Sequence, residues 1–224
     1  MTANRLAILV DFDDTAAQQN VAETLLKTFG GSNWEGYRED FRNGSLNLRY
    51  YQEKAFNEID ATLEEMGEVI GELAWLRLGF KDFNDYCMAN DIRLSFVTNG
   101  LRFYVDALVH KAGLWNIPSY AVDVDGEPGN LQYSYPYATR NCWEWGNCKC
   151  KVLEQHREDG SKIVFVGDGR SDLCASQNAD FVFARSTLLK HCQQLHLTHQ
   201  EFENFYDVLA ALKLGIPDVW NPRL

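Results

Sequence analysis

A continuous apolar run that ends in acidic residues is the feature that most constrains how this chain can fold. Residues 6–12 read LAILVDF, and Asp13, Asp14 and Thr15 follow directly. An uninterrupted apolar run of this length is typical of a strand that is buried on both faces, as in a parallel sheet. Similar strands are predicted at 93–98, 162–166 and 181–184.

Helical patterns between these strands indicate an α/β architecture. Helices are expected at about 18–29, 49–77, 81–90, 101–112, 149–158 and 200–213. Strands that alternate with helices favour a mostly parallel, Rossmann-like sheet. The segment between the first two strands is too long for a single crossover helix. We therefore expect a catalytic core formed by residues 1–15 and 80–224, with a helical cap inserted at 16–79.

Residues 119–140 have a different pattern, which predicts a small β insertion in the core. A turn sequence, DGEPG, occupies 125–129 and is followed by apolar and aromatic residues at every second position from Leu131 to Tyr137. Alternation of this kind after a turn is typical of a hairpin and does not fit a helix.

The charge balance excludes several classes of partner. The chain has 21 Lys and Arg residues against 32 Asp and Glu residues, a net charge of −11. Such a chain lacks the basic surface of a protein that binds nucleic acid or an anionic membrane.

The sequence shows neither a membrane-spanning pattern nor a signal-peptide pattern. No apolar window reaches the ~18 residues of a membrane-spanning helix, and no signal-peptide cleavage site follows the first apolar run. A cytoplasmic protein is therefore expected.

Acidic side chains follow the first and third strands, and this arrangement predicts a metal site. Asp11 ends the first strand, while Asp168 and Asp172 follow the third. In an open parallel sheet the carboxyl ends of the strands share one edge, where ligands bind. Carboxylates that crowd together cannot all remain ionised unaided, and Mg²⁺ is the divalent cation best suited to such oxygen ligands.

Four motifs along the chain resemble those of the haloacid dehalogenase superfamily of phosphohydrolases. They are DFDDT at 11–15, Thr98, Lys149, and GDGRSD at 167–172, and they occur in the order found in that superfamily. The resemblance implies an α/β core with a cap, Mg²⁺ as cofactor, and hydrolysis of a small phosphorylated metabolite.

The resemblance also implies a catalytic role for four residues. Asp11 is the nucleophile that becomes an aspartyl-phosphate, and Asp13 is first the general acid and then the general base. Thr98 donates its hydroxyl group to the phosphoryl oxygens, and Lys149 neutralises the nucleophile and the phosphate. These roles agree with the chemistry, since a carboxylate nucleophile divides one difficult displacement into two easier ones.

Metal binding is implied for four aspartates. Asp11, the backbone carbonyl of Asp13, and Asp168 are the implied direct ligands, while Asp172 either binds the metal or orients its waters. Asp14, where the superfamily usually has Gly, is expected to point outward or to cap the next turn.

Substrate binding is expected of residues on the second strand and in the cap. Thr98, Asn99 and Gly100 end the strand. Arg49 lies in the cap and could reach a carboxylate or phosphate of the substrate; a solvated position on a helix face is an equally good interpretation.

The sequence around Lys149 resembles that of one subfamily. Gly146-Asn147-Cys148-Lys149 matches the Gly-x-Cys-Lys pattern of phosphoserine phosphatases and methionine-salvage phosphatases, which favours Lys149 over Lys151. Residues 179–185 look like the tail of the methionine-salvage phosphatases. Thr98-Asn99-Gly100 departs from their usual Ser-Gly-Gly, so the resemblance does not identify one substrate.

Two questions stay open at this point. Cys142, Cys148 and Cys150 lack the paired spacing of a zinc knuckle, so ordinary reduced thiols are favoured over a zinc site. A phosphotransferase or phosphomutase would use the same motifs as a hydrolase. A non-catalytic binding protein on the same fold is disfavoured, because every motif residue is retained.

Overall fold

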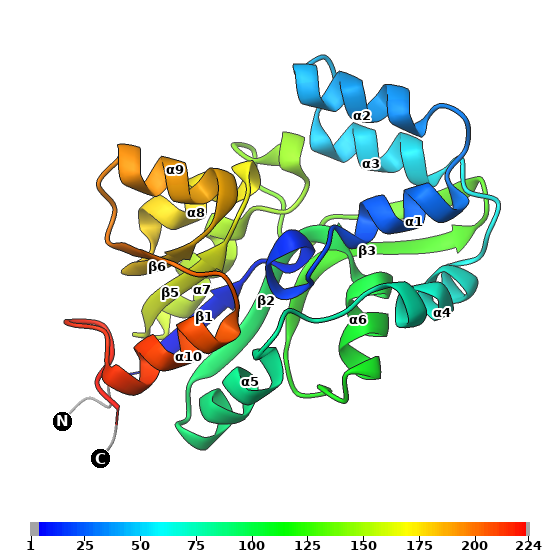
Figure 1. Ribbon diagram of the computed structural model, residues 1–224. Coiled ribbons are helices and arrows are strands. Elements are labelled where there is room, and N and C mark those ends of the chain that lie inside the picture. The colour runs from blue at the N-terminus through cyan, green and yellow to red at the C-terminus, as the bar shows by residue number, and fades with distance from the viewer. Residues whose placement is uncertain (1–4, 223–224) are drawn as a thin grey trace.

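The computed structural model describes residues 5–222 and has a seven-stranded sheet at its centre (Figure 1). The strand order is β4-β3-β2-β1-β5-β6-β7. The strands are β1 Leu6–Val10, β2 Arg93–Leu101, β3 Ser119–Glu127, β4 Asn130–Ser134, β5 Lys162–Gly167, β6 Phe181–Ala184 and β7 His199–Glu201. Every neighbouring pair is parallel except β3 and β4, which are antiparallel. The predicted α/β fold with a mostly parallel sheet is therefore confirmed.

The first apolar run forms the centre of the sheet. Strand β1 pairs with β2 on one side, where Val10 lies opposite Phe96, and with β5 on the other, where Val10 lies opposite Val166. All five residues of β1 are buried. Because three parallel strands end together here, the residues after them share one edge of the sheet.

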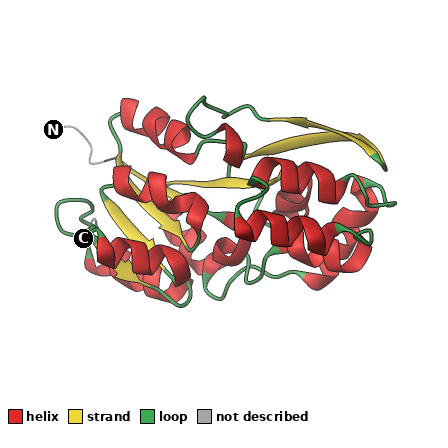
Figure 2. Ribbon diagram, turned by 90° about the horizontal axis from the view of Figure 1, so that it is seen from above, coloured by secondary structure: helices red, strands yellow, loops and turns green. Residues whose placement is uncertain are grey.

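The two faces of the sheet bury separate hydrophobic cores, and helices cover both faces (Figure 2). Ile8 and Val10 point into the larger core, whereas Ala7 and Leu9 point into the smaller one, as the alternation of a strand requires. The larger core includes side chains of α1 Val21–Phe29, α4 Leu63–Leu73, α5 Phe80–Ala89, α6 Arg102–Lys111 and α10 Phe205–Leu214. The smaller core includes side chains of α7 Lys149–Glu158, α8 Leu173–Asn178 and α9 Ser186–Gln194.

The segment between β1 and β2 is helical, as expected, but its second half is divided differently. Where one helix was predicted at 49–77, the structure has α3 Leu48–Phe56 and then α4, which begins after Thr62. Thr62 and Glu65 form a reciprocal capping box, so the chain starts a new helix there. Helices α3 and α2 Trp34–Asn43 lie beyond the carboxyl edge of the sheet, above α1 in Figure 1.

The predicted hairpin is present and extends the sheet. Strand β3 pairs with β2 and continues into a two-stranded ribbon with β4, visible as the long projecting strands in Figure 2. The short strand β7, beside β6, was not predicted. Within residues 5–222 there is no helix with both the length and the apolar character needed to cross a membrane.

Candidate active site

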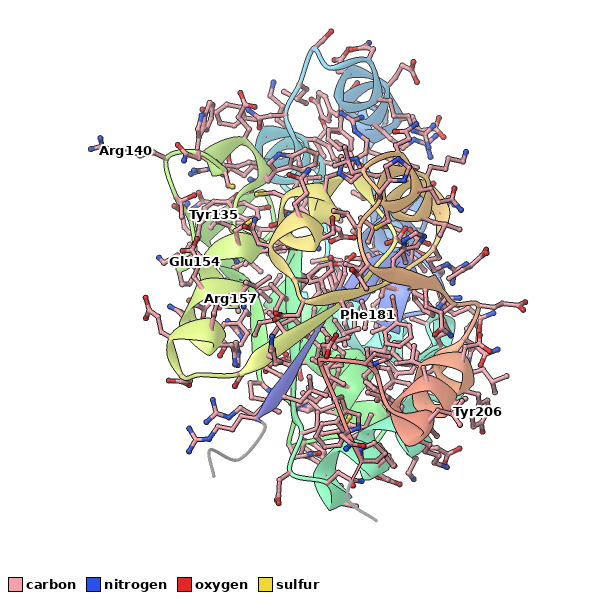
Figure 3. The ribbon with its side chains drawn as sticks, turned by 90° about the vertical axis from the view of Figure 1, so that its left-hand side faces the viewer. Tyr135, Arg140, Glu154, Arg157, Phe181 and Tyr206 are labelled. Carbon is pink, nitrogen blue, oxygen red and sulfur yellow. The ribbon has the colours of Figure 1, made fainter. Side chains whose placement is uncertain are left out.

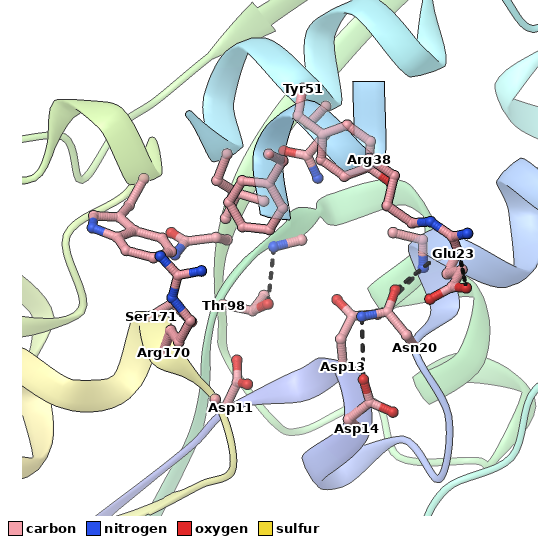
Figure 4. Close-up of a pocket in the computed structure, with 18 of the residues that line it drawn as sticks. Asp11, Asp13, Asp14, Asn20, Glu23, Arg38, Tyr51, Thr98, Arg170 and Ser171 are labelled. Atoms are coloured by element: carbon pink, nitrogen blue, oxygen red, sulfur yellow. Dashed lines mark hydrogen bonds and ion pairs between the residues drawn. The ribbon is translucent and has the colours of Figure 1, made fainter. Parts of the chain in front are cut away.

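A cavity of about 480 Å³ opens at the carboxyl ends of β1, β2 and β5 (Figure 4). Its floor contains Asp11, Asp13, Thr98 and Asp168. Its upper wall is formed by residues of α1, α2 and α3. The strand-end residues singled out in the sequence are thus brought to one place.

Asp11 is held at the bottom of the cavity by its backbone and by Lys149. Its backbone N–H donates to the carbonyl oxygen of Val166 at 2.9 Å, which extends the pairing of β1 with β5 past the end of the strand. Its Oδ1 accepts a hydrogen bond from Nζ of Lys149 at 2.5 Å. The carboxylate is therefore fixed in position and paired with a buried cation.

Lys149 also contacts Asp172, which lies beneath the site. Nζ of Lys149 is 2.6 Å from Oδ1 of Asp172, and Oδ2 of Asp172 accepts the backbone N–H groups of Asp168 at 3.0 Å and Gly169 at 2.9 Å. Asp172 is completely buried, and these contacts occupy both of its oxygens. Lys151, the alternative considered from the sequence, instead contacts the carbonyl oxygen of Pro136.

Asp11, Asp168 and Asp172 form a compact carboxylate cluster, with one oxygen of each within 4.8 Å of the others. Burial, together with Asp172 and Asp168, raises the pKa of Asp11 well above its usual range, although Lys149 opposes the rise. Burial and Asp172 likewise raise the pKa of Asp168 to about 7. The three carboxylate oxygens converge, and their negative charges repel one another. Such a set of donors suits a hard divalent cation.

The side chain of Asp13 is held by donors from two helices. Its Oδ1 accepts the backbone N–H groups of Val21 at 2.7 Å and Ala22 at 3.3 Å, in the first turn of α1. Its Oδ2 accepts the hydroxyl group of Tyr104, on α6, at 2.8 Å. Loss of water around the carboxylate raises the pKa of Asp13 to about 6, against the effect of these hydrogen bonds. A carboxyl group with this pKa can both give and accept a proton near neutral pH.

The end of β2 supplies a hydroxyl group whose proton remains available. Oγ1 of Thr98 accepts the backbone N–H of Gly100 at 2.9 Å, which leaves the hydroxyl proton free to be donated. Asn99 also lines the cavity, and its Oδ1 is buried without a hydrogen-bond partner among the described residues. Gly100 packs so closely that a Cβ there would lie 2.2 Å from Oη of Tyr104 and 2.9 Å from Oδ2 of Asp13.

The loop after Asp11 is braced by Arg77, which the sequence did not single out. Its buried guanidinium group donates to the carbonyl oxygens of Thr15 at 2.7 Å and Asp14 at 2.5 Å, with longer contacts to Ala17 and Gln18. Asp14 has a left-handed backbone conformation, with φ of 59°, a conformation that Gly adopts without steric cost. Backbone hydrogen bonds from Ala16 to Asp11 and from Ala17 to Phe12 also hold this turn, and Arg77 adds donors from a distant part of the chain.

Arg49 does not line the cavity. Its Nε is 3.0 Å from Oε1 of Glu53, and its guanidinium group lies over the ring of Tyr135. The rotation of α3 directs Arg49 towards the segment after β4, away from the carboxylates. Three other cations line the cavity: Arg38, Arg42 and Arg170. The spacing of Arg38 and Arg42, one turn apart on a helix, is the sequence signal that could have indicated them.

Comparison with protein families identifies the fold family. A family model described as haloacid dehalogenase-like hydrolase matches residues 8–177. The chain belongs to this family. Among curated relatives, the 2-hydroxy-3-keto-5-methylthiopentenyl-1-phosphate phosphatase of Geobacillus kaustophilus is 31% identical over 222 residues, covering 93% of this chain and 96% of the relative. The phosphatase of the same name from Lysinibacillus sphaericus is 31% identical over 218 residues, covering 92% and 93%.

Solved structures agree with this assignment. A substrate-bound phosphoserine phosphatase complex has a TM-score of 0.70 at 18% identity, covering 92% of this chain and 97% of that one. A phospho-aspartyl intermediate analogue of phosphoserine phosphatase has a TM-score of 0.69 at 17% identity, covering 92% and 98%. At these identities the likeness concerns the fold. The curated relatives, at 31% identity, identify this haloacid dehalogenase-like hydrolase as a phosphatase.

Proposed function

We propose that this phosphatase hydrolyses a monoester of a small phosphorylated metabolite through an aspartyl-phosphate on Asp11, with Mg²⁺ as cofactor. One observation carries the proposal. Nζ of Lys149 contacts the carboxylate of Asp11 at the floor of the cavity, and burial raises the pKa of Asp13, which lines the same cavity, to about 6. This arrangement supports the proposal, because Asp11 and Asp13 line one cavity and the cation Lys149 contacts Asp11 from behind.

In the first half-reaction, an oxygen of Asp11 attacks phosphorus, and the bond from phosphorus to the ester oxygen breaks. Asp13 gives its proton to that leaving oxygen. Lys149 and the hydroxyl group of Thr98 stabilise the charge on the phosphoryl oxygens. The products are the free alcohol and phosphorylated Asp11.

In the second half-reaction, Asp13 is ionised and removes a proton from water. The water oxygen attacks phosphorus, the bond to Asp11 breaks, and inorganic phosphate leaves. The two N–H donors of α1 and the hydroxyl group of Tyr104 hold the Asp13 carboxylate in the same place for both steps. One residue can therefore act as acid and then as base.

Asp11, Asp168 and the backbone carbonyl of Asp13 would hold Mg²⁺. When bound, the ion offsets the charge of the carboxylates and of the phosphoryl group. Both oxygens of Asp172 are already used by Lys149 and by two backbone N–H groups. Asp172 is therefore assigned as the residue that positions Lys149, and it contacts metal-bound water at most.

The upper wall of the cavity supports a substrate with an apolar part. Phe41 and Tyr51 stack with ring centroids 5.5 Å apart, and Trp145 meets the edge of Phe41 at 6.5 Å. Curated relatives act, by name, on a phosphate ester with a methylthio group. An apolar thioether tail suits an aromatic wall of this kind. We therefore place sulfur-containing, sugar-derived phosphates first among the candidate substrates.

A phosphate-release screen with Mg²⁺ tests the proposal. The panel should contain methylthio-substituted keto-phosphates, phosphoserine and phosphoethanolamine. Turnover that EDTA stops, that Mg²⁺ restores, and that Asp11→Asn abolishes is the expected result. Activity that survives metal removal would contradict the metal assignment. A phosphorylated acceptor in place of free phosphate would make the enzyme a phosphotransferase.

A further inference from the structure

Four of the six cysteines gather behind the active site, around Lys149. Cys148 and Cys150 flank that lysine at the start of α7, and Cys142 precedes them in the loop after β4. Cys174 lies at the start of α8, two residues after Asp172. The proposed reaction uses none of these thiols, although they adjoin the residues that position its cation.

The four sulfur atoms contact one another in a row, because Cys148 and Cys150 are hydrogen-bonded to each other and each also contacts one further cysteine. Sγ of Cys150 is 2.6 Å from Sγ of Cys174, and Sγ of Cys148 is 3.2 Å from Sγ of Cys142. A tetrahedral metal site would bring three or four thiolates together. Over residues 5–222, the one set of three candidate ligand atoms within 4.8 Å of each other is the aspartate cluster described above. The contact between Cys150 and Cys174 is the shorter of the two distances, and such a contact is the arrangement of a dithiol that can be oxidised to a disulfide.

We propose that Cys150 and Cys174 are a modification site, which a peroxide converts into a disulfide joining α7 to α8. Cys174 is exposed, so its thiolate can attack the peroxide, giving a sulfenic acid and releasing hydroxide from hydrogen peroxide. The buried thiol of Cys150 then attacks the sulfenic sulfur, the S–S bond forms, and water leaves. Two thiols are oxidised and one peroxide is reduced to two molecules of water.

The position of the pair determines what the disulfide does. Asp172 and Lys149 already join the starts of the same two helices through a contact of 2.6 Å. A disulfide bond of about 2.05 Å requires the sulfurs to approach by only roughly half an ångström. The oxidised enzyme therefore keeps Lys149 in place. We expect phosphatase activity within about two-fold of the reduced enzyme, and a melting temperature higher by roughly 5–10 °C.

Cys148 is the competing partner, because hydrogen bonds from Cys150, Thr139 and Cys142 lower the pKa of Cys148 to about 4. Trypsin separates the alternatives. Cleavage after Arg140, Lys149 and Lys151 puts Cys142 and Cys148 in peptide 141–149 and Cys150 in the dipeptide 150–151. Cys174 is in peptide 171–185. Arg140 projects into solvent (Figure 3), whereas Lys149 is buried, so the oxidised protein is unfolded before digestion to allow cleavage at both sites.

The experiment treats the full-length enzyme with hydrogen peroxide, blocks free thiols with iodoacetamide, and digests with trypsin. The expected product is peptide 150–151 linked to peptide 171–185, together with the rise in melting temperature; dithiothreitol should reverse both.

Two variants test the assignment. Cys174→Ser should lose the linked peptide and the rise in melting temperature. Cys192→Ala, which removes a different, buried thiol on α9, should keep both. Linkage through peptide 141–149, sulfinic acid without linkage, or one zinc ion per chain in the isolated protein would overturn the proposal. These readouts do not require turnover, so they stand or fall separately from the proposed phosphatase mechanism.

Discussion

The hydroxyl group of Tyr104 donates a hydrogen bond of 2.8 Å to Oδ2 of Asp13, across 91 positions of sequence. Tyr104 is completely buried, and its donor stabilises the ionised form of the carboxyl group. The relationship links a helix of the core to the residue that must both release and accept a proton. Tyr104 is therefore a positioning residue whose effect should appear in the pH dependence of catalysis.

Replacing Tyr104 with Phe should shift the pH profile. The pKa of Asp13 is already raised to about 6, and removing a donor to its ionised form raises it further, by about one unit. Because the first half-reaction needs protonated Asp13, kcat/KM should fall at a higher pH than in the wild-type enzyme. The maximal kcat should drop about 10-fold. Steady-state kinetics from pH 5 to 9 measures both effects.

Tyr206→Phe is the matched control. Its hydroxyl group also donates to an aspartate at 2.8 Å, Asp82, but Tyr206 lies at the outside of the molecule (Figure 3), and neither residue lines the cavity. This variant should keep the wild-type profile. A Tyr104→Phe enzyme with lower activity but an unmoved alkaline limb would assign Tyr104 a purely structural role.

A methyl group at Gly100 should disturb the same hydrogen bond. The added Cβ would lie 2.2 Å from Oη of Tyr104, so the tyrosine must move away from Asp13. We expect Gly100→Ala to lose at least 10-fold in kcat. Gly36→Ala is the control, since no atom lies within 4 Å of its added Cβ and alanine favours the helix. Equal activity of the two variants would show that the close packing at Gly100 is unimportant.

Arg77 should contribute more to stability than an ordinary surface cation. Arg77→Met removes the donors to the carbonyl oxygens of Asp14 and Thr15 in the loop that follows the nucleophile. Urea unfolding should show that the free energy of unfolding falls by about 2–4 kcal/mol. Arg93→Met, which breaks an exposed pair with Asp159, should cost less than about 1 kcal/mol. A small effect at both positions would contradict the bracing role.

The carboxylate cluster should make the metal-free enzyme less stable at neutral pH. The pKa of Asp168 is about 7 in the folded protein, above its usual 3.8, so the folded state binds this proton more tightly than the unfolded state. Its contribution to stability is therefore present at low pH and is lost as pH rises from about 4 to 7. Asp168→Asn should stabilise the metal-free protein at pH 7.5 by on the order of 2–3 kcal/mol.

Unfolding in EDTA and in Mg²⁺ measures this effect. Mg²⁺ should stabilise the wild-type protein and not Asp168→Asn. Asp14→Asn is the control, because Asn tolerates the left-handed backbone of that position, and it should respond to Mg²⁺ as the wild type does. Equal stabilisation of Asp168→Asn by Mg²⁺ would place the metal elsewhere.

The apolar runs of the sequence predicted the sheet well, because a strand buried on both faces has few alternatives. The convergence of Asp11 with Asp168 could be predicted too, since parallel strands that end together must place their next residues on one edge. The helix boundary at Thr62 was missed because apolar residues continue at helical spacing on both sides of it. A capping box between Thr62 and Glu65 was the local signal that outweighed the stripe.

Other parts of the site could not be read from the sequence. Tyr104 and Arg77 resemble ordinary helix and linker residues until the fold brings them to Asp13 and to the loop after Asp11. The rotation of α3, which directs Arg49 onto Tyr135 and away from the cavity, depends on packing. The contact of Cys150 with Cys174 joins two helices that are separated by β5, and it depends on how they pack against the sheet.

The most direct test of the account is to find where the phosphoryl group resides during turnover. Enzyme mixed with labelled substrate and Mg²⁺ should be quenched in acid within milliseconds, digested and mapped. The label should be on the peptide that contains Asp11, should be released by hydroxylamine, and should be absent from Asp11→Asn. Label on another residue, or wild-type turnover by Asp11→Asn, would contradict the proposed mechanism.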